Sequence, residues 1–440
     1  MKNFSSFGLS VPEILLPIED IPLDQWAVIA CDQYTQDREY WSRVGETVGD
    51  APSTLSLILP EVHLGGPEEK ERIAAIRSTM KDYLAKGVFR PAFCGLVYVE
   101  RTTEYGRVRK GLVAAVDLEC YEWKPFSKAL IRATEATIPE RIPPRMEIRR
   151  GAALELPHIM LLVNDKAGCL VESCGKAVKD QGLEPLYEGE LMLGAGRIAG
   201  YPVRGGLLDN SLAALERLVE ENTTPKGGTF LFAVGDGNHS LATAKAVWDE
   251  FKEAQLARGK LPDDVASSPL RYALVEIVSI YDSGLTFEPI HRVVFGCDAA
   301  TLMDFCRDRL AGRLVDEESG EALAQKVAGS TSSFGFVFVD GAGAQCFRRL
   351  ETKGTELAVS RLQPVLDEFL AGKDGEIDYI HGEDEVFRLG SQPGAVAILL
   401  PPVAKDSFFS TIGSGGPLPR KSFSMGEASE KRFYLEARRI

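Results

Sequence analysis

Residues 228–257 constrain the fold of this 440-residue chain more than any other part of its sequence. They begin with a short apolar run, Gly228-Thr-Phe-Leu-Phe-Ala-Val234, which is followed by the glycine-rich stretch Gly235-Asp-Gly-Asn-His-Ser240. A helix-forming stretch then runs from Leu241 to about Ala257. This order predicts a buried strand, a tight turn and a helix.

The turn between the predicted strand and helix is suited to bind phosphate. Gly235 and Gly237 let the backbone turn sharply and approach a ligand without Cβ atoms. The N–H groups that would point out of the helix start, where the helix dipole adds positive charge, are those of Asn238, His239 and Ser240. Asp236 and His239 would lie at the mouth of this cradle, where both could exchange protons and Asp236 could hold a divalent cation. The alternative is a plain tight turn in which Asp236 and Ser240 cap the helix.

The composition excludes several classes of protein. Hydrophobic residues make up 45% and charged residues 26%, which is ordinary for a globular chain and excludes disordered, collagen-like and coiled-coil proteins. Lys and Arg number 50 against 64 Asp and Glu, which gives a net charge of −14. Since such a charge repels phosphate backbones, we expect no nucleic-acid partner. An anionic small substrate would need a local pocket of cations or of backbone N–H groups.

The cysteines and the apolar runs indicate the expected compartment. The eight cysteines are scattered and none forms a C-x-x-C pair, so we expect reduced thiols rather than a disulfide framework or a zinc cage. No apolar run approaches the ~20 residues that a membrane helix needs. We therefore expect a soluble cytoplasmic protein without membrane contact, and a homo-oligomer remains open.

Patterns along the rest of the chain predict a mixed α/β (α+β) fold. Residues 95–100 and 107–117 have a hairpin pattern, whereas 68–86 and 210–222 have helix patterns. Residues 131–150 cannot form one helix, because Pro143-Pro144 interrupts them. Helix-like and strand-like pieces alternate beyond residue 300. We therefore expect a catalytic region over 1–300 and an α+β region over 301–440.

Two common nucleotide-binding patterns fail in this sequence. Gly194-Ala-Gly-Arg-Ile-Ala199 matches G-x-G-x-x-A, but Gly200-Tyr-Pro202 follows where a helix should begin, so we interpret the segment as a loop. The P-loop pattern G-x-x-x-x-G-K-[ST] and the catalytic-loop pattern of protein kinases do not occur. We expect neither a P-loop enzyme nor a standard protein kinase.

Several segments resemble one known family. Gly235-Asp-Gly-Asn-His-Ser-Leu-Ala-Thr-Ala-Lys245 is similar to the D-G-x-H motif of the ParB/sulfiredoxin superfamily, whose members bind phosphate groups at this helix start. The other matching segments, in chain order, are 26–33, 141–145, 156–160, 288–292 and 419–422. Together they resemble a family long labelled as of unknown function, some members of which are pyrophosphate-dependent free serine kinases.

The resemblance implies a ParB/sulfiredoxin-like core with an added α+β C-terminal region, whose tail could return to the active site. It also implies transfer of a phosphoryl group from pyrophosphate to L-serine, which gives O-phospho-L-serine and phosphate, with Mg²⁺ screening the charge of the donor. Positioning and charge neutralisation would supply most of the rate. Two alternatives stay open: an ATP- or ADP-dependent serine kinase, and a non-catalytic ParB-like regulator that binds phosphate or nucleotide.

The candidate catalytic residues are Asp32, Asp236 and His239. Asp32 follows the short apolar run 26–30, in the region where related serine kinases carry an acidic residue. It could take the proton of the serine hydroxyl or hold Mg²⁺. The alternative is an aspartate in a turn before Gln33. Whether Asp32 or Asp236 is the base stays open.

The candidate phosphate- and substrate-binding residues include several arginines, because guanidinium groups bind phosphate oxygens in a bidentate manner. The alternative is a solvated charged loop, since glutamates interleave with these arginines. His291 and Arg292 form a cationic pair at a strand end, and Lys421 follows a Gly/Pro loop and could close over an anion. The full set comprises Gly235, Gly237, Asn238, Ser240, Arg132, Thr134, Glu135, Thr137, Arg141, Arg145, His291, Arg292 and Lys421.

Overall fold

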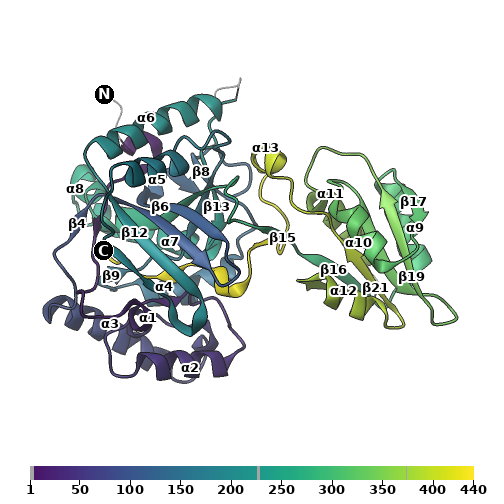
Figure 1. Ribbon diagram of the computed structural model, residues 1–440, viewed down its shortest axis with the longest axis horizontal. Helices are drawn as coiled ribbons and strands as arrows, with labels where there is room; N and C mark the ends of the chain where they lie inside the picture. The colour runs from purple at the N-terminus through teal and green to yellow at the C-terminus, as the bar shows by residue number, and fades with distance from the viewer. Residues whose placement is uncertain (1–3, 225–227, 373) are drawn as a thin grey trace. The chain divides into compact units, whose positions relative to one another are not determined.

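The computed structural model of the protein describes residues 4–224, 228–372 and 374–440, which form two compact units (Figure 1). The first unit spans Met1–Leu285 and Glu427–Ile440, and the second spans Thr286–Gly426. The chain therefore leaves the first unit after Leu285, whereas the sequence alone suggested a division near residue 300. The C-terminal segment belongs to the first unit, so the expected region 301–440 differs from the second unit at both ends.

A ten-stranded mixed sheet forms the centre of the first unit. Its strands, in spatial order, are β11 (Tyr187–Glu190), β12 (Gly196–Val203), β5 (Leu96–Thr103), β6 (Val108–Asp117), β14 (Tyr272–Ser279), β10 (Met160–Val163), β13 (Phe232–Asp236), β8 (Ile131–Ala133) and β7 (Tyr121–Glu122), with β1 (Leu9–Ser10) paired to β6. The pairs β10–β14, β13–β8 and β7–β8 are parallel, whereas the β5–β6 hairpin and β10–β13 are antiparallel.

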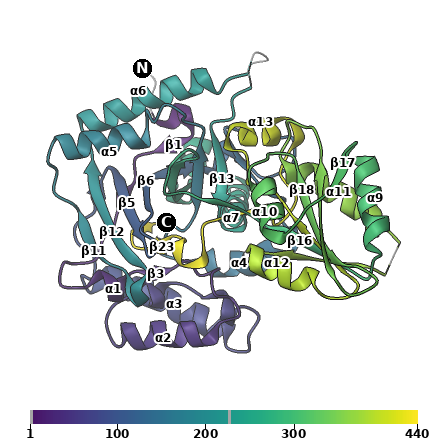
Figure 2. The ribbon, with the colours of Figure 1, turned by 45° about the vertical axis from the view of Figure 1, so that its right-hand side comes forward.

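Helices surround this sheet and confirm the mixed α/β class. They are α1 (Leu23–Trp26), α2 (Arg38–Val48), α3 (Glu69–Ala85), α4 (Ile142–Arg149), α5 (Val171–Asp180), α6 (Gly206–Glu221), α7 (Asn238–Ala257) and α8 (Pro262–Ala266). The helices predicted over 68–86 and 210–222 are present as α3 and α6. Figure 2, like Figure 1, shows α5 and α6 next to each other on the same side of the sheet.

The predicted strand, turn and helix of residues 228–257 are present as β13, a turn at Gly237 and α7. β13 lies in the interior of the sheet between β10 and β8, and Phe232 and Val234 are fully buried. Gly237 has a φ of 77°, in the left-handed region that glycine adopts without strain. A Cβ atom at this position would lie 3.0 Å from Cγ1 of Ile159. Both the conformation and the close approach therefore favour glycine.

Residues 131–150 fold as three short elements rather than one helix, as predicted. These are β8, the 3-10 turn Pro139–Arg141 and α4. The two prolines lie in the first turn of α4, where a missing N–H would have no helical partner in any case. Ile142 and Met146 of α4 pack against Ala242 and Val247 of α7. This contact fixes α4 and its arginines beside α7.

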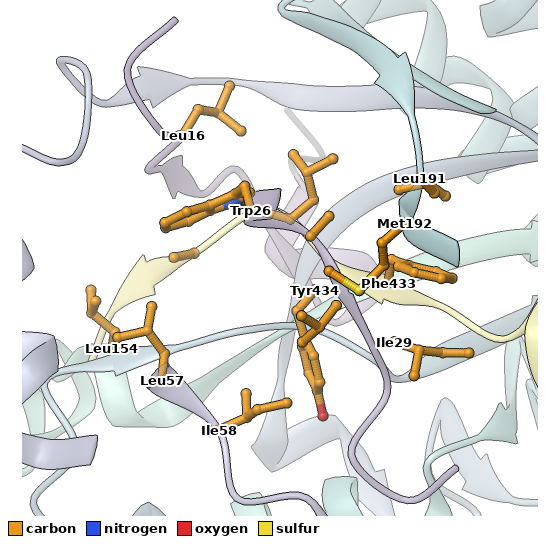
Figure 3. Close-up of a cluster of buried hydrophobic side chains, with 14 of the residues drawn as sticks. Leu16, Trp26, Ile29, Leu57, Ile58, Leu154, Leu191, Met192, Phe433 and Tyr434 are labelled. Atoms are coloured by element: carbon orange, nitrogen blue, oxygen red, sulfur yellow. Dashed lines mark hydrogen bonds between the residues drawn. The ribbon is translucent and has the colours of Figure 1, made fainter. Parts of the chain in front are cut away.

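The N-terminal and C-terminal segments pair with each other and with the core of the first unit. The pairs are β23 (Phe433–Tyr434) with β3 (Val28–Ile29), β24 (Arg438–Arg439) with β9 (Leu154–Glu155), and β2 (Glu13–Ile14) with β4 (Phe93–Cys94). The indole N–H of Trp26 donates a hydrogen bond to the carbonyl of Leu435 (2.9 Å). Figure 3 shows Trp26 and Tyr434 in one hydrophobic cluster. The C-terminal segment is therefore part of this core.

The second unit is built around a six-stranded antiparallel sheet. Its order is β17 (Arg313–Asp316), β19 (Gln345–Glu351), β18 (Phe334–Val339), β21 (Ala395–Leu399), β16 (His291–Phe295) and β20 (Glu376–Ile380). Its helices are α9 (Ala299–Arg309), α10 (Gly320–Ala328), α11 (Ala358–Leu370), α12 (Glu383–Gly390) and α13 (Lys405–Gly415), and β15 (Phe287–Pro289) pairs with β22 (Phe423–Met425). Val293 and Val337 of the sheet share a core with Leu323 of α10 and Val386 of α12.

Three other expectations can be compared with the structure. The loop expected at residues 194–199 is wrong, because residues 196–199 belong to β12; Gly194 and Gly196, where the chain enters the strand, have positive φ. The eight cysteines are all free thiols. Within the described part of the chain, no helix combines the length and the apolar character that crossing a membrane requires.

Candidate functional site

The N-terminus of α7 is the centre of the candidate site. Among the described residues no side chain caps this helix, and the N–H of Leu241 donates to the carbonyl of Gly237 (3.0 Å). The N–H groups of Asn238, His239 and Ser240, in the first turn of the helix, have no helical carbonyl one turn earlier with which to pair. Together with the positive end of the helix dipole, these groups suit an anion.

Asp236 lies directly before this turn, at the end of β13. Its Oδ1 accepts a hydrogen bond from the N–H of Gly237 (2.9 Å), and its Oδ2 lies 3.2 Å from Nζ of Lys431. Lys431 precedes β23 in the C-terminal segment, and its side chain is only 11% exposed. The sequence analysis did not identify Lys431, because no local pattern relates a charged residue in the tail to a turn in the middle of the chain.

The pKa of the His239 imidazole depends on the charges of three predicted residues, Asp32, Arg141 and Arg145. Burial, followed by the charges of Arg145 and Arg141, lowers the pKa of His239 from 6.5 to about 4, and the charge of Asp32 acts in the opposite direction. Electrostatic effects of this kind require short distances. Asp32, Arg141 and Arg145 thus lie near the imidazole of His239, in the first turn of α7.

Glu61 joins this group of charged residues. It forms an ion pair with Arg145. The guanidinium of Arg145 also donates a hydrogen bond to the carbonyl of Arg141 (3.0 Å). The backbone N–H of Glu61 donates to the carbonyl of Cys31 (2.8 Å), directly before Asp32. The sequence analysis did not identify Glu61 either, since it lies in a short 3-10 turn without a recognisable pattern.

His239 is neutral at physiological pH, and its ring nitrogens have different roles. Nε2 accepts a hydrogen bond from the backbone N–H of Ile138 (3.2 Å). A neutral imidazole carries one proton, so this contact assigns the proton to Nδ1. His239 can therefore donate a hydrogen bond to an anion through Nδ1, while its acceptor nitrogen is already engaged.

Ser240 belongs to a chain of hydrogen bonds that reaches the C-terminal segment. Its Oγ lies 2.7 Å from Nε2 of His158, and Nδ1 of the same ring lies 3.0 Å from the hydroxyl of Tyr434. That hydroxyl also accepts from the N–H of Cys31 (3.2 Å). Because His158 and Tyr434 are buried, this chain fixes the orientation of the Ser240 hydroxyl.

The predicted residues of segment 134–138 lie along the start of α7. The backbone N–H of Thr134 donates to Oδ1 of Asn238 (3.3 Å), and its hydroxyl donates to the carbonyl of Val234 (2.6 Å). Thr134 and Asn238 thus fix the turn. The hydroxyl oxygen of Thr137 is buried and has no hydrogen-bond partner among the residues that the structure describes, and Glu135 in the same segment is half-buried.

Arg132 takes no part in this group of charges. Its guanidinium donates to the carbonyls of Ala129 (2.8 Å) and Thr229 (3.1 Å) and stacks on the ring of Phe230. Burial lowers its pKa. These contacts give Arg132 a role in fixing the segment before β13.

Three predicted residues lie in the second unit. His291 is buried and accepts from the N–H of Leu400 (3.0 Å); burial, followed by the charge of Arg292, lowers its pKa to about 4. Arg292 is fully buried and donates to the side chain of Gln363 (2.8 Å). Lys421 and Arg292 both contact the ring of Tyr379, at 5.3 and 4.6 Å from its centre. Within the second unit these residues form a group of their own.

A cavity of about 150 Å³ opens beside the first turns of α7. Its polar lining includes Ser240, His158 and Tyr434 and the pair Arg145–Glu61. Its apolar lining comprises Leu57, Ile58, Leu59, Leu64, Met80, Ile148, Ala152, Leu154, Leu156, Ile159 and Leu274. Figure 3 shows Leu57, Ile58 and Leu154 in the hydrophobic cluster that contains Tyr434. The anion cradle thus has an apolar pocket next to it.

The acidic residues of the site can be compared with the ligands that a metal ion requires. In the described parts of the chain, no group of three or more His, Cys, Asp or Glu residues could hold a metal. Mg²⁺ usually binds through one or two carboxylates together with substrate phosphates. Asp32 and Asp236, two of the acidic residues near the α7 start, fit that mode of binding.

Comparisons with known proteins gave weak structural similarities. A conserved hypothetical protein from Pyrococcus furiosus is 11% identical, with a TM-score of 0.34 and coverage of 74% of this chain and 94% of that chain. A free serine kinase in complex with AMP is 11% identical, with a TM-score of 0.35 and coverage of 73% and 90%. SbnI with a C-terminal truncation, from Staphylococcus aureus, is 10% identical, with a TM-score of 0.35 and coverage of 71% and 83%.

The sequence comparisons are more specific. No curated protein matches the chain. A family model described as "Protein of unknown function (DUF1015)" matches residues 15–369, which include β13, the start of α7, Asp32 and the arginines of α4. The chain therefore belongs to the DUF1015 family.

Proposed function

We propose that the protein is a phosphotransferase that moves a phosphoryl group from pyrophosphate to the hydroxyl of free L-serine, giving O-phospho-L-serine and phosphate. The observation that carries this proposal is the uncapped start of α7 with acidic and cationic side chains around it. Asp236, directly before the turn, forms an ion pair with Lys431 of the C-terminal segment, and the charges of Asp32, Arg141 and Arg145 act on His239 in the first turn of the helix. The motif resemblance of residues 235–245 supports the same chemistry.

The donor would be held by the N–H groups of Asn238, His239 and Ser240 and by the neighbouring cations. In phosphoryl transfer the protein acts mainly by aligning the reactants and neutralising developing charge. Nδ1–H of His239 adds a donor of fixed direction, and Oγ of Ser240 adds a hydroxyl that His158 holds in place. The buried hydroxyl of Thr137, which has no hydrogen-bond partner among the residues that the structure describes, would gain one from a bound oxygen.

The hydrogen bonds of the two aspartates support Asp32 as the base. Asp236 uses one carboxylate oxygen for the N–H of Gly237 and the other for Lys431. Oδ1 of Asp32 accepts from the side chain of Gln33 (3.0 Å), a half-buried neighbour whose amide a substrate could displace. Asp32 would orient the serine hydroxyl and accept its proton as the oxygen–phosphorus bond forms. Asp236 would hold the turn and Lys431.

The proposal includes Mg²⁺ bound to the phosphoryl donor, pyrophosphate. Phosphate oxygens would be its main ligands, with the lone pairs that Asp32 and Asp236 leave free beside them, and it would screen the negative charge of the transferring group. Removing divalent cations with a chelator should then abolish transfer.

A nucleotide donor is the second candidate, and the cavity beside α7 favours it. Pyrophosphate has no base, so it leaves an apolar pocket unused, whereas the base of ATP or ADP would bury apolar surface there. The lining by Leu57, Ile58 and Leu154 next to Ser240 offers such a surface. The alternative is therefore an ATP- or ADP-dependent transfer to the same acceptor.

The test is to incubate the protein with L-serine, Mg²⁺ and, separately, pyrophosphate, ATP and ADP, and to quantify phosphoserine by mass spectrometry. L-Alanine, which lacks the hydroxyl, is the matched control acceptor. Phosphoserine from pyrophosphate supports the first candidate, and phosphoserine only from a nucleotide supports the second. Binding of pyrophosphate without product from any donor would support the non-catalytic regulator instead.

A further inference from the structure

We infer that Lys431 is a phosphoryl-binding residue of this site and that the C-terminal segment completes the site by supplying it. The inference rests on the proposed function and deepens it. Lys431 lies beyond residues 15–369, which the family model matches, so the assignment depends on the structure of this chain alone.

The strand pairing brings the backbone of Lys431 to the segment that carries Asp32. β23 runs antiparallel to β3, with Phe433 opposite Ile29, and the N–H of Ala30 donates to the carbonyl of Arg432 (2.9 Å). Continuing this register places Lys431 opposite Cys31, next to Asp32. Its ammonium at the same time lies 3.2 Å from Asp236. The ammonium of Lys431 thus lies at Asp236, while its backbone lies at the segment of Asp32.

Buried ion pairs fix the backbone on both sides of Lys431. Arg432 is fully buried, forms an ion pair with Glu276, and donates to Glu436 (2.6 Å) and to the carbonyl of Pro157 (3.1 Å).

On the other side, Glu430 accepts two hydrogen bonds from Arg107 (2.8 and 2.6 Å). Its carbonyl accepts from Arg109 (2.7 Å). The flexible side chain of a lysine therefore starts here from a rigid backbone, which lowers the entropy lost when it binds a ligand.

The ammonium of Lys431 has the donors that a phosphoryl group requires. It carries three N–H bonds, and Asp236 is its one salt-bridge partner among the described residues. The remaining donors can bind the non-bridging oxygens of the transferring group, where negative charge is concentrated. In the transfer, the bond from the serine oxygen to phosphorus forms, the bond to the leaving phosphate breaks, and the serine proton passes to Asp32. Lys431 keeps its proton throughout.

The competing explanation is that the Lys431–Asp236 pair only attaches the tail to the turn. A purely structural pair would lower stability when broken but leave the activity of the folded enzyme unchanged. A ligand to the phosphoryl group would instead control kcat and donor binding. The two explanations therefore predict different measurements on the same variants.

The experiment uses the full chain with Lys431→Met, Lys431→Arg and Lys431→Ala, and Lys260→Met as the control that removes an exposed lysine of the first unit. We expect Lys431→Met to lower kcat by about 10²–10³-fold, as for loss of one transition-state donor. The KM for L-serine should stay within about twofold, and Lys431→Arg should recover activity only in part. Ethylammonium added to Lys431→Ala should restore activity in a saturable manner.

Thermal unfolding of each variant separates loss of folding from loss of function. If folded Lys431→Met keeps wild-type kcat, or if Lys431→Ala is inactive, folded and not rescued by ethylammonium, the inference is overturned. If the wild type itself makes no phosphoserine from any donor, the proposed function fails, and pyrophosphate binding then tests Lys431 separately. A tenfold or greater loss of affinity in Lys431→Met supports the binding role, and unchanged affinity contradicts it.

Discussion

At the scale of single residues, Arg145 is a cation that already has partners. It forms an ion pair with Glu61 and donates to the carbonyl of Arg141. A bound phosphate would share this guanidinium with Glu61, whose carboxylate fixes the direction of its N–H groups. The arginine cluster could be predicted from composition, but the partner that orients it could not, because Glu61 is distant in the sequence.

Replacing Arg145 should affect the two substrates unequally. A charge-assisted hydrogen bond contributes about 1.5–3 kcal/mol, so Arg145→Ala should raise the donor KM by roughly 10- to 150-fold. Arg145→Lys should restore it partly, since an ammonium lacks the planar fork. Arg150→Ala, which removes an arginine paired with Glu147 and Glu250 after the end of α4, is the matched control. If the serine KM rises and the donor KM does not, Arg145 binds the carboxylate of the acceptor.

The low pKa of His239 predicts how activity depends on pH. Because its pKa is about 4, His239 stays neutral throughout the range between about pH 5.5 and 8 and changes no charge there. His239→Asn, which keeps a donor, should therefore lower activity without altering the shape of the profile of kcat/KM against pH in this range. Loss of an acid limb near pH 6.5 in this variant would show that His239 titrates during catalysis.

At the scale of elements, the sequence predicted the parts whose signal is local. The order of β13, the Gly237 turn and α7 follows from an apolar run, two glycines and a helix-forming stretch. The ladder begins at Phe232 rather than Gly228, because the N–H groups of Leu231 and Phe232 both donate to the carbonyl of Leu130 (3.0 Å each). Such an irregularity depends on a neighbouring strand and has no sequence signal.

The turn at Gly237 should tolerate no side chain. In Gly237→Ala the left-handed conformation costs about 1–2 kcal/mol, and the new Cβ meets Ile159, so the free energy of unfolding should fall by at least that amount. Gly45→Ala is the opposite case, because Gly45 lies within α2 with no atom near its missing Cβ. It should raise stability by roughly 0.5–1 kcal/mol. Urea unfolding compares the two variants, and equal effects would contradict the role assigned to the turn.

At the scale of the whole chain, the candidate site is assembled from segments that are distant in the sequence. Asp32 follows β3, Arg145 lies in α4, Asp236 ends β13 and Lys431 precedes β23. The net charge of −14 opposes an anionic donor, so these local cations have to outweigh it. Pairings such as Asp236 with Lys431 could not be predicted from one sequence, since charge alone does not select a partner.

The buried ion pairs of Arg432 should contribute strongly to the stability of the first unit. Arg432→Met leaves Glu276 and Glu436 without this cation, and breaking a buried pair in this way costs about 3–5 kcal/mol. Arg439→Met removes an exposed arginine of the same segment and should change stability by at most ~0.5 kcal/mol. Denaturant unfolding measures both, and a small effect for Arg432→Met would show that the tail is not held by these charges.

The most direct test of phosphoryl transfer at the α7 start is a ³¹P NMR time course of the protein with pyrophosphate, Mg²⁺ and L-serine. Asp32→Asn, which keeps the shape of the side chain but removes the base, is followed in parallel. We predict that the wild type converts the pyrophosphate signal into equal amounts of phosphoserine and phosphate, and that Asp32→Asn is slower by about 10²–10⁴-fold. Formation of phosphate without phosphoserine, or equal rates for the wild type and Asp32→Asn, would contradict phosphoryl transfer to serine with Asp32 as the base.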